Sequence, residues 1–165
     1  MNQSIRIGYG YDTHRLGPDH DLYLGGVKIP FEKGLIGHSD ADVLIHAICD
    51  ALLGALNLRD IGFHFPNTDP AYKGIDSRIL LQRTYELVRQ KGYILGNLDS
   101  TIIAEAPKIN PHIPAMQQVM AELLDTEVEN LSIKATTHET TDAVGRGESM
   151  IAQAVVLLFR REQNA

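Results

Sequence analysis

The sequence is short of cysteine and of positive charge and has no long apolar run, and each shortage excludes a class of protein. Its single cysteine, Cys49, cannot form an intrachain disulfide framework, so the chain fits a reducing compartment and we expect it in the cytoplasm. No stretch approaches the roughly 18 apolar residues of a membrane-spanning helix. The residues Met1-Asn2-Gln3-Ser4 lack the charged and apolar regions of a signal peptide. We therefore expect no membrane partner.

The charge balance and the missing motifs narrow the chemistry further. The 15 Lys and Arg residues stand against 21 Asp and Glu, a net charge of −6, and they form no basic stripe. Because nucleic-acid backbones select such stripes, we expect no nucleic-acid partner. The sequence also lacks Walker A, Gly-x-Ser-x-Gly and Cys-x-x-Cys patterns, which leaves P-loop and common nucleophilic-triad chemistry without support.

The length of 165 residues and the absence of repeats, linkers and low-complexity tracts predict one domain over residues 1–165. A chain of this size buries roughly 70% of the surface that its unfolded form exposes. It therefore needs no metal to hold its core together, and a bound metal is expected to be functional.

Two patterns near the N-terminus predict strands. Alternation at Ile5-Arg6-Ile7 leads into Gly8-Tyr9-Gly10, where glycines favour a bend or a close backbone approach. Residues 23–24 and 27–29 flank Gly25-Gly26, a spacing typical of a tight hairpin.

The remaining chain predicts three helices and three further strands. An apolar stripe predicts a helix over 41–56, capped by Ser39 or Asp40, with Cys49 as a small buried hydrophobe. The other predicted helices cover 77–91 and, after Asn110, a stretch ending near Asp125. Strands are expected over 99–105, 131–137 and 151–159, the last buried on both faces. This mixture favours an α+β sandwich with helices on one face of the sheet.

Asp12, His14 and His46 are candidate metal ligands. Asp12 and His14 are separated by one residue, so in an extended chain both project to the same side. Together with His46 they would leave a fourth tetrahedral position open, as catalytic zinc requires, with Asp42 or Asp50 orienting His46. The alternative is a solvated helix face that carries an incidental histidine.

Two polar segments are candidate phosphate and polyol sites. His38 and Ser39 precede the 41–56 helix, whose free N–H groups favour an anion, although ordinary capping explains Ser39 equally well. Asp60-Ile61-Gly62 and the loop over 65–70 would suit a polyol hydroxyl, or form a plain turn with Asx-type hydrogen bonds.

Two later segments have the same ambiguity. The strand end at 104–108 could present backbone groups to a base edge or be an ordinary strand exit. Thr136 and Thr137 suit either a strand or a phosphate, Glu139 is a good Mg²⁺ ligand, and Arg146 between glycines can approach a phosphate.

Ten short motifs occur in one order along nearly the whole chain. They are Arg6-Ile7-Gly8, Gly10-Tyr11-Asp12-Thr13-His14, Gly25-Gly26-Val27-Lys28-Ile29-Pro30, His38-Ser39-Asp40-Ala41-Asp42-Val43, Asp50-Ala51-Leu52-Leu53-Gly54-Ala55, Asp60-Ile61-Gly62, Phe65-Pro66-Asn67-Thr68-Asp69-Pro70, Ala106-Pro107-Lys108, Lys134-Ala135-Thr136-Thr137 and Gly145-Arg146-Gly147-Glu148. In this order they resemble the 2-C-methyl-D-erythritol 2,4-cyclodiphosphate synthase family of the non-mevalonate isoprenoid pathway.

The resemblance implies a ferredoxin-like two-layer α+β sandwich, with a mixed β-sheet and helices on one face. It further implies a homotrimer with active sites at the subunit boundaries and an apolar channel near the threefold axis. An isoprenoid diphosphate is the expected ligand of this channel, with Arg146 at its mouth.

The resemblance also implies residue roles. Asp12, His14 and His46 would bind Zn²⁺, and Glu139 would bind Mg²⁺ or Mn²⁺. His38 and Thr137 would be catalytic, contacting phosphates and steadying the transition state. The implied substrate-binding residues are Ser39, Asp60, Ile61, Gly62, Phe65, Pro66, Asn67, Thr68, Asp69, Ala104, Glu105, Ala106, Pro107, Lys108, Ile109, Asn110, Thr136, His138, Glu139 and Arg146.

The implied reaction is that of a metal-dependent lyase. The 2-phosphate of 4-diphosphocytidyl-2-C-methyl-D-erythritol 2-phosphate attacks the β-phosphorus, closes 2-C-methyl-D-erythritol 2,4-cyclodiphosphate and releases CMP. The small-molecule partner is thus a substrate with a cytidine diphosphate group. Because both reacting groups share one molecule, catalysis needs mainly a folded substrate and neutralised phosphate charge.

Four positions depart from the family pattern. Tyr11 stands where Phe is common, a mild change that keeps the ring. Asn67 stands where the family usually has Asp, Glu105 where Gln is frequent, and Ala143 where Phe is common near the channel.

Two other functions stay open at this point: a zinc phosphohydrolase that acts on nucleotide diphosphates with a bound water, and a non-catalytic trimeric module that senses isoprenoid diphosphates.

Overall fold

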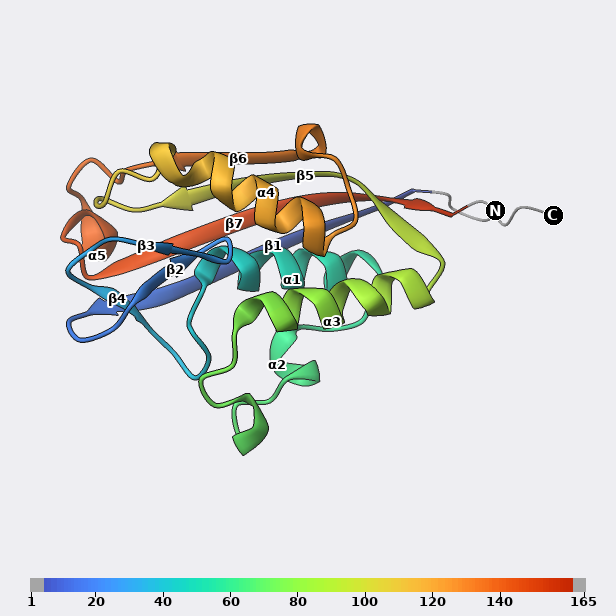
Figure 1. Cartoon of the computed structure of the whole chain (residues 1–165), viewed down its shortest axis with the longest axis horizontal. Helices are drawn as coiled ribbons and strands as arrows, with labels where there is room; N and C mark the ends of the chain where they lie inside the picture. The colour runs from blue at the N-terminus through green and yellow to red at the C-terminus, as the bar shows by residue number, and fades with distance from the viewer. Residues whose placement is uncertain (1–4, 162–165) are drawn as a thin grey trace.

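The computed structural model describes residues 5–161, so the stretch considered above for a signal peptide, residues 1–4, lies outside the described residues. Strands, α-helices and 3-10 turns follow one another along this range (Figure 1). The strands are β1 (Ile5–Gly17), β2 (Leu22–Leu24), β3 (Val27–Ile29), β4 (Gly34–Ile36), β5 (Tyr93–Ile103), β6 (Leu131–Thr136) and β7 (Ser149–Arg160). The helices are α1 (Val43–Ala55), α2 (Ile61–His64), α3 (Ser77–Gln90), α4 (Ile113–Leu123) and α5 (Asp142–Gly145), with 3-10 turns η1 (Pro70–Tyr72), η2 (Asn110–His112) and η3 (Val128–Asn130).

Five of the strands form one mixed sheet in the order β4-β1-β7-β5-β6. β5 and β6 run parallel with α4 between them in the chain, whereas the other neighbours are antiparallel. The predicted α+β class with a mixed sheet is confirmed. β2 and β3 form the predicted hairpin, and Gly25 and Gly26 have φ values of 58° and 77°, as a two-residue turn of this type requires.

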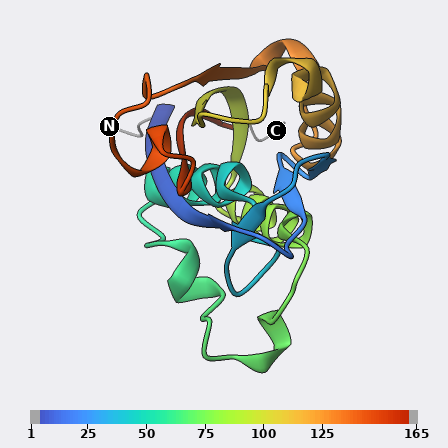
Figure 2. The ribbon, with the colours of Figure 1, turned by 90° about the vertical axis from the view of Figure 1, so that its left-hand side faces the viewer.

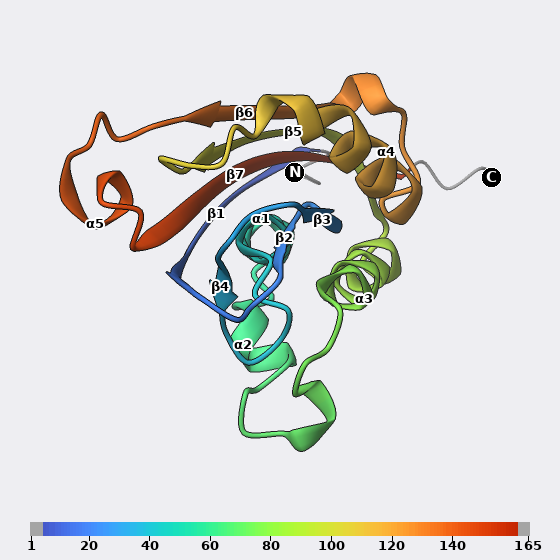
Figure 3. The same ribbon diagram turned by 60° about the vertical axis from the view of Figure 1, so that its left-hand side comes forward.

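The helices lie on one side of the sheet, as the sequence predicts. Figures 2 and 3 show α1, α3 and α4 within the curve of the sheet, with α3 packed beside α1. One continuous cluster of buried apolar side chains fills the space between these layers. Within residues 5–161, no helix is long and apolar enough to cross a membrane.

The opposite side of the sheet, which we call the outer face, carries exposed apolar side chains. The prediction that the strand over 151–159 is buried on both faces is wrong for the single chain, because Val155 and Phe159 are 43% and 40% exposed. Tyr9 pairs with Val155 in the next strand and is 59% exposed. The outer face is formed by Ile7, Tyr9, Tyr11, Val155 and Phe159.

Two glycines allow α1 to lie directly against β1. A Cβ atom on Gly10 would lie 1.9 Å from the carbonyl oxygen of Ala47, and one on Gly8 would lie 1.8 Å from that of Ala51. Real Cβ atoms do not approach backbone so closely, so only glycine fits either position. The close approach predicted for these glycines is therefore confirmed, and β1 continues through both of them to Gly17.

The predicted helix ends were shifted by local hydrogen bonds. α1 begins at Val43 because Asp42, not Ser39 or Asp40, accepts the N–H of Ile45 as the N-cap. α3 begins at Ser77 as predicted, and the stretch after Asn110 forms a 3-10 turn before α4 starts at Ile113. The predicted strand over 99–105 is the end of a longer β5, which includes an irregularity between Leu95 and Asn97.

Candidate metal centre and active-site cavities

The inner face of β1 and one side of α1 bring three metal-ligating atoms together. Asp12 Oδ2 lies 2.9 Å from His14 Nε2 and 3.0 Å from His46 Nδ1. The two histidine nitrogens are 3.1 Å apart. The three side chains are the one group of three or more histidine, cysteine or acidic residues with metal-ligand spacing among residues 5–161.

The donor set fits a tetrahedral ion. Zn–N and Zn–O bonds of about 2.0–2.1 Å in a tetrahedron place neighbouring donor atoms roughly 3.3 Å apart, so the three atoms need to separate by only a few tenths of an ångström. Two imidazoles and one carboxylate leave a fourth position free, which is the pattern of catalytic rather than structural zinc.

The electrostatics of the cluster also favour a cation. Burial by itself would raise the pKa of Asp12, but the hydrogen bonds from His14 and His46 lower it to about 2. Burial would lower the pKa of His14, yet the hydrogen bond with Asp12, the charge of Asp12 and the hydrogen bond to the Ile36 carbonyl together leave this pKa raised. The carboxylate is therefore ionised, and its negative charge favours a cation at the cluster.

Both histidines have a second partner that orients the ring. Nδ1 of His14 donates to the carbonyl oxygen of Ile36 at 3.0 Å, which leaves Nε2 facing the cluster. Nε2 of His46 lies 3.1 Å from the Ser39 hydroxyl and 3.0 Å from the Ser77 hydroxyl, which leaves Nδ1 facing the cluster. Such outer partners are typical of metal-binding histidines.

The predicted orienting role of Asp42 or Asp50 is wrong. Asp42 is fully buried and accepts the N–H groups of Gly25, Gly26 and Ile45, so it joins the hairpin to the start of α1. Asp50 accepts the Ile61 N–H at 2.7 Å and holds α2 instead. Burial raises the pKa of both carboxyls. Sequence spacing predicted that these carboxylates would contact His46, but they accept hydrogen bonds from nearby backbone N–H groups instead.

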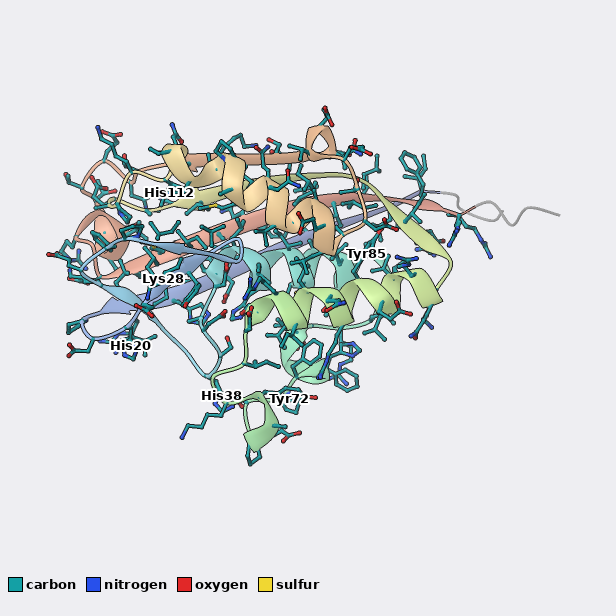
Figure 4. All side chains as sticks on the ribbon, viewed as in Figure 1. His20, Lys28, His38, Tyr72, Tyr85 and His112 are labelled. Carbon is teal, nitrogen blue, oxygen red and sulfur yellow. The ribbon has the colours of Figure 1, made fainter. Side chains whose placement is uncertain are left out.

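A cavity of about 200 Å³, which we call the metal cavity, opens beside the cluster. Figure 4 shows His38 and Tyr72 near one another at its loop side. Asp60 and Asp69 belong to the same loop region and cap α2 and η1 through the Phe63 and Ala71 N–H groups. The residues that line the metal cavity are His14, His38, Ser39, His46, Ile61, Gly62, Phe65, Asn67, Tyr72, Ile75 and Leu80.

A second cavity of about 450 Å³, the strand-end cavity, lies where the parallel strands β5 and β6 end together. The Ala106–Pro107 peptide bond on its rim is cis. It is lined by Ala104, Glu105, Pro107, Lys108, Ile109, Asn110, Pro111, Ala135, Thr136 and Thr137. Exposed backbone groups at such a strand end can hydrogen-bond the edge of a base.

The two cavities are separate within one chain and share no lining residue. β1, which carries two metal ligands, is separated from β6 by β7 and β5. At about 4.8 Å per strand this separation is on the order of 14 Å. The structure therefore divides most of the predicted site residues between two groups rather than gathering them in one.

Glu139 lies beyond the strand-end cavity on an exposed loop. Its carboxylate accepts the Thr137 hydroxyl at 2.8 Å. Glu139, Thr140 and Asp142 have φ values of 51°, 61° and 55°, a region that costs non-glycine residues energy. The predicted contact residue His138 pairs with Asp142 at 2.8 Å.

Arg146 lies at a third cavity of about 460 Å³ beside Arg15 and Lys33, with Ala143 on the same lining. Its guanidinium donates to Glu148 at 2.8 Å. The lining carries three cationic side chains and one carboxylate, that of Glu148, so positive charge is in excess there.

Sequence reasoning missed four residues near the metal cluster: Tyr72, Ile75, Ser77 and Leu80. Tyr72 is half-buried against Phe65, with ring centroids 5.5 Å apart. Ser77 begins the helix predicted over 77–91, and as an ordinary helix-start residue it carried no signal of contact with His46. Cys49 is buried as predicted, and burial raises its pKa to about 12, which keeps the thiol protonated.

An ionised carboxylate and two oriented imidazoles, with an open position beside a cavity, define a metal-dependent enzyme on this α+β fold.

The chain belongs to the YgbB family, which it matches over residues 5–159. It is 61% identical over 159 residues to the 2-C-methyl-D-erythritol 2,4-cyclodiphosphate synthase of Porphyromonas gingivalis, covering 96% of this chain and 98% of the relative. The enzyme of the same name from Parabacteroides distasonis is 59% identical over 156 residues, which cover 94% of this chain and 97% of the relative. The resemblance drawn from the sequence motifs is thereby confirmed.

Solved structures of related enzymes have the same fold as this chain. The IspF of Plasmodium falciparum, in complex with CDP, is 34% identical with a TM-score of 0.86, covering 98% of this chain and 100% of that one. The bifunctional IspDF from Campylobacter jejuni is 40% identical with a TM-score of 0.92, covering 96% of this chain and 43% of that one.

Proposed function

We propose that the protein converts 4-diphosphocytidyl-2-C-methyl-D-erythritol 2-phosphate to 2-C-methyl-D-erythritol 2,4-cyclodiphosphate and CMP. The observation that carries this function is the Asp12, His14 and His46 cluster beside a cavity, in a chain 61% identical to a synthase of that name over nearly its full length. The CDP bound to a related structure supports a substrate with a cytidine diphosphate group.

Asp12, His14 and His46 would hold Zn²⁺, and Glu139 would hold Mg²⁺ or Mn²⁺. When bound, zinc would polarise phosphate oxygens, and the second ion would offset the charge of the CMP leaving group. His38 and Ser39 line the metal cavity and offer donors to the reacting phosphates. Thr137, at the strand-end cavity, is the second candidate for steadying phosphate charge.

The other substrate contacts divide between the cavities. Asp60, Gly62 and the loop over 65–69 would hold the methylerythritol hydroxyls beside the metal cluster. The strand ends over 104–110 and 136–139 would hold cytidine and diphosphate. Asn67 lines the metal cavity, so its change from the usual acid removes a charge there.

A homotrimer would join the two halves of the site. The exposed apolar outer face supports assembly, because monomers rarely leave so many large apolar side chains in water. Neighbouring subunits would bring one chain's metal cavity to another chain's strand-end cavity. Each subunit would be one ferredoxin-like domain over residues 1–165, and an isoprenoid diphosphate would enter the central channel past Arg146.

The residues account for catalysis without a strong general base. The attacking phosphate is already ionised near neutral pH, so the chain needs to fold the substrate and neutralise crowded charge. The rigid cluster on β1 and α1 fixes one end of the substrate, and the strand-end cavity fixes the other. We place the enzyme in the cytoplasm, where an unpaired buried cysteine stays reduced.

Phosphorus NMR of the metal-loaded protein with this substrate tests the proposal. Joint appearance of CMP and a cyclic diphosphate is the expected result. CMP together with an open-chain bisphosphate, carrying oxygen-18 from labelled water, would instead establish a phosphohydrolase. No reaction, combined with tight binding of an isoprenoid diphosphate, would favour the non-catalytic module.

A further inference from the structure

Ser77 connects the metal cluster to a helix that contributes no metal ligand. It is the first residue of α3 and is 1% exposed. Its hydroxyl oxygen lies 3.0 Å from Nε2 of His46, although the two residues are 31 positions apart in the chain. A buried hydroxyl at hydrogen-bond distance from a ligand's outer nitrogen is placed to orient that ring.

Asp40 determines how the hydroxyl of Ser77 is used. The Ser77 hydroxyl donates to Asp40 Oδ1 and the Ser77 N–H donates to Asp40 Oδ2 at 3.0 Å. Because a carboxylate only accepts, the hydroxyl proton points toward Asp40. The oxygen of Ser77 is then left as an acceptor for the ring of His46.

This direction of donation fixes the tautomer of His46. An acceptor at Nε2 requires that Nε2 carry the proton, and in a neutral imidazole Nδ1 then holds the lone pair. Nδ1 is the nitrogen that faces Asp12 and His14. The carbonyl oxygen of Ile36 imposes the opposite tautomer on His14, whose Nε2 faces the cluster.

Ser39 differs from Ser77 although both hydroxyls lie near Nε2. Ser39 already accepts the Ala41 N–H at 3.1 Å and lines the metal cavity. Its own proton is therefore placed to serve a ligand in that cavity. The hydroxyl of Ser77, which donates to Asp40, is therefore the acceptor for Nε2 of His46.

We infer that Asp40 and Ser77 form a positioning relay that holds His46 with Nδ1 ready to bind the metal. The relay also ties the cavity wall to the centre, because the Asp40 N–H donates to the Ile75 carbonyl at 3.1 Å and the Gly74 N–H donates to the His38 carbonyl at 2.7 Å. The inference rests on the proposed metal centre and adds two residues that act on it indirectly.

The test measures Zn²⁺ affinity of the metal-stripped protein by competition with a chromogenic chelator. Ser77→Ala is expected to bind Zn²⁺ about 10- to 100-fold more weakly than wild type, as for other outer partners of metal-binding histidines. Ser77→Thr keeps the hydroxyl and is expected to recover most of the affinity. Ser100→Ala is the matched control, because Ser100 is 2% exposed and donates to the Ser132 carbonyl at 2.9 Å, away from the cluster.

Asp40→Asn supplies an independent arm. If Asp40 acts through Ser77, the double variant binds Zn²⁺ no more than about twofold more weakly than Ser77→Ala alone. Thermal unfolding of each metal-free variant shows whether a weaker Zn²⁺ affinity results from misfolding. If Ser77→Ala does not fold, the Zn²⁺ affinity of Asp40→Asn tests the relay in its place.

Three results would overturn the relay: wild-type affinity in Ser77→Ala, an equal loss in Ser100→Ala, or fully additive losses in the double variant. A wild-type protein that binds no Zn²⁺ would overturn the proposed metal centre itself, and the relay with it. The two failures are thus distinguishable.

Discussion

Gly10→Ala tests whether the close packing of α1 on β1 sets the geometry of the metal cluster. The new Cβ would lie 1.9 Å from the Ala47 carbonyl oxygen, against 3.4 Å or more for an ordinary contact, so the helix must retreat by about 1.5 Å. His46 precedes Ala47 and would move with it. Its Nδ1, now 3.0 Å from Asp12 Oδ2, would then lie beyond the roughly 3.3 Å edge of a tetrahedral zinc site.

The expected cost is about 3 kcal/mol of unfolding free energy, the upper end for overpacking, because the obstacle is backbone and cannot rotate away. Activity should fall by about 100-fold or more, as a misplacement near 1 Å can produce. Urea unfolding measures the first quantity, and CMP release under saturating Zn²⁺ measures the second.

Gly54→Ala is the control for this prediction. Gly54 lies on α1 as well, but a Cβ there would meet the Tyr9 carbonyl oxygen at an ordinary 3.8 Å. This variant should gain about 0.5–1 kcal/mol from helix propensity and keep full activity. Wild-type stability and activity in Gly10→Ala would refute the claim that the glycines of β1 determine where α1 lies.

The other predictions concern ligands, charge, capping and assembly. His46→Ala should abolish turnover and leave the proposed trimer intact, and full activity would remove the zinc assignment. Glu139→Gln should weaken activity in a way that excess Mg²⁺ partly restores; an unchanged metal requirement would exclude Glu139 as a ligand. Because metal and proton compete for His14, whose pKa is raised, Zn²⁺ affinity should increase from about pH 6 to about pH 8; a flat titration would contradict this. Asp42→Ala removes the acceptor of three N–H groups and should cost about 3 kcal/mol in urea unfolding. Tyr9→Asp should dissociate the proposed trimer in light scattering, and an unchanged mass would exclude the outer face as its interface.

Local patterns predicted the ligands of the cluster because each depends on a short-range rule. Alternation in a strand puts Asp12 and His14 on one side, and helical periodicity separates His46 from the buried stripe. The hairpin at Gly25-Gly26 is equally local, since two positive φ values define it. Which strand lies under which helix is a long-range property that residue spacing does not reveal. The expectation that β1 and α1 share one metal site therefore came from the ordered motifs of a known family.

The errors have the same origin. Asp42 and Asp50 are four residues to either side of His46, which suggested contact with its ring. A carboxylate instead accepts from whichever N–H groups the fold places beside it. For Asp42 two of these belong to the hairpin at 25–26. Ser77 contacts His46 only because α3 packs against α1. The strand over 151–159 was predicted to be buried on both faces because an apolar strand does not reveal whether its second face meets helices or another chain.

The arrangement separates the parts of the site that must be rigid from the parts that receive the substrate. Asp12, His14 and His46 lie on a long strand and a buried helix, where tight backbone packing holds donor atoms near 3 Å from one another. The loops around the metal cavity, the strand ends and the Glu139 loop are more exposed and can adjust to a ligand. A cyclisation within one flexible substrate needs both properties, since one end must be fixed while the other is brought to it. Under the proposed function, the separation of the two cavities within a single chain is the feature that would make assembly of subunits a requirement of the chemistry.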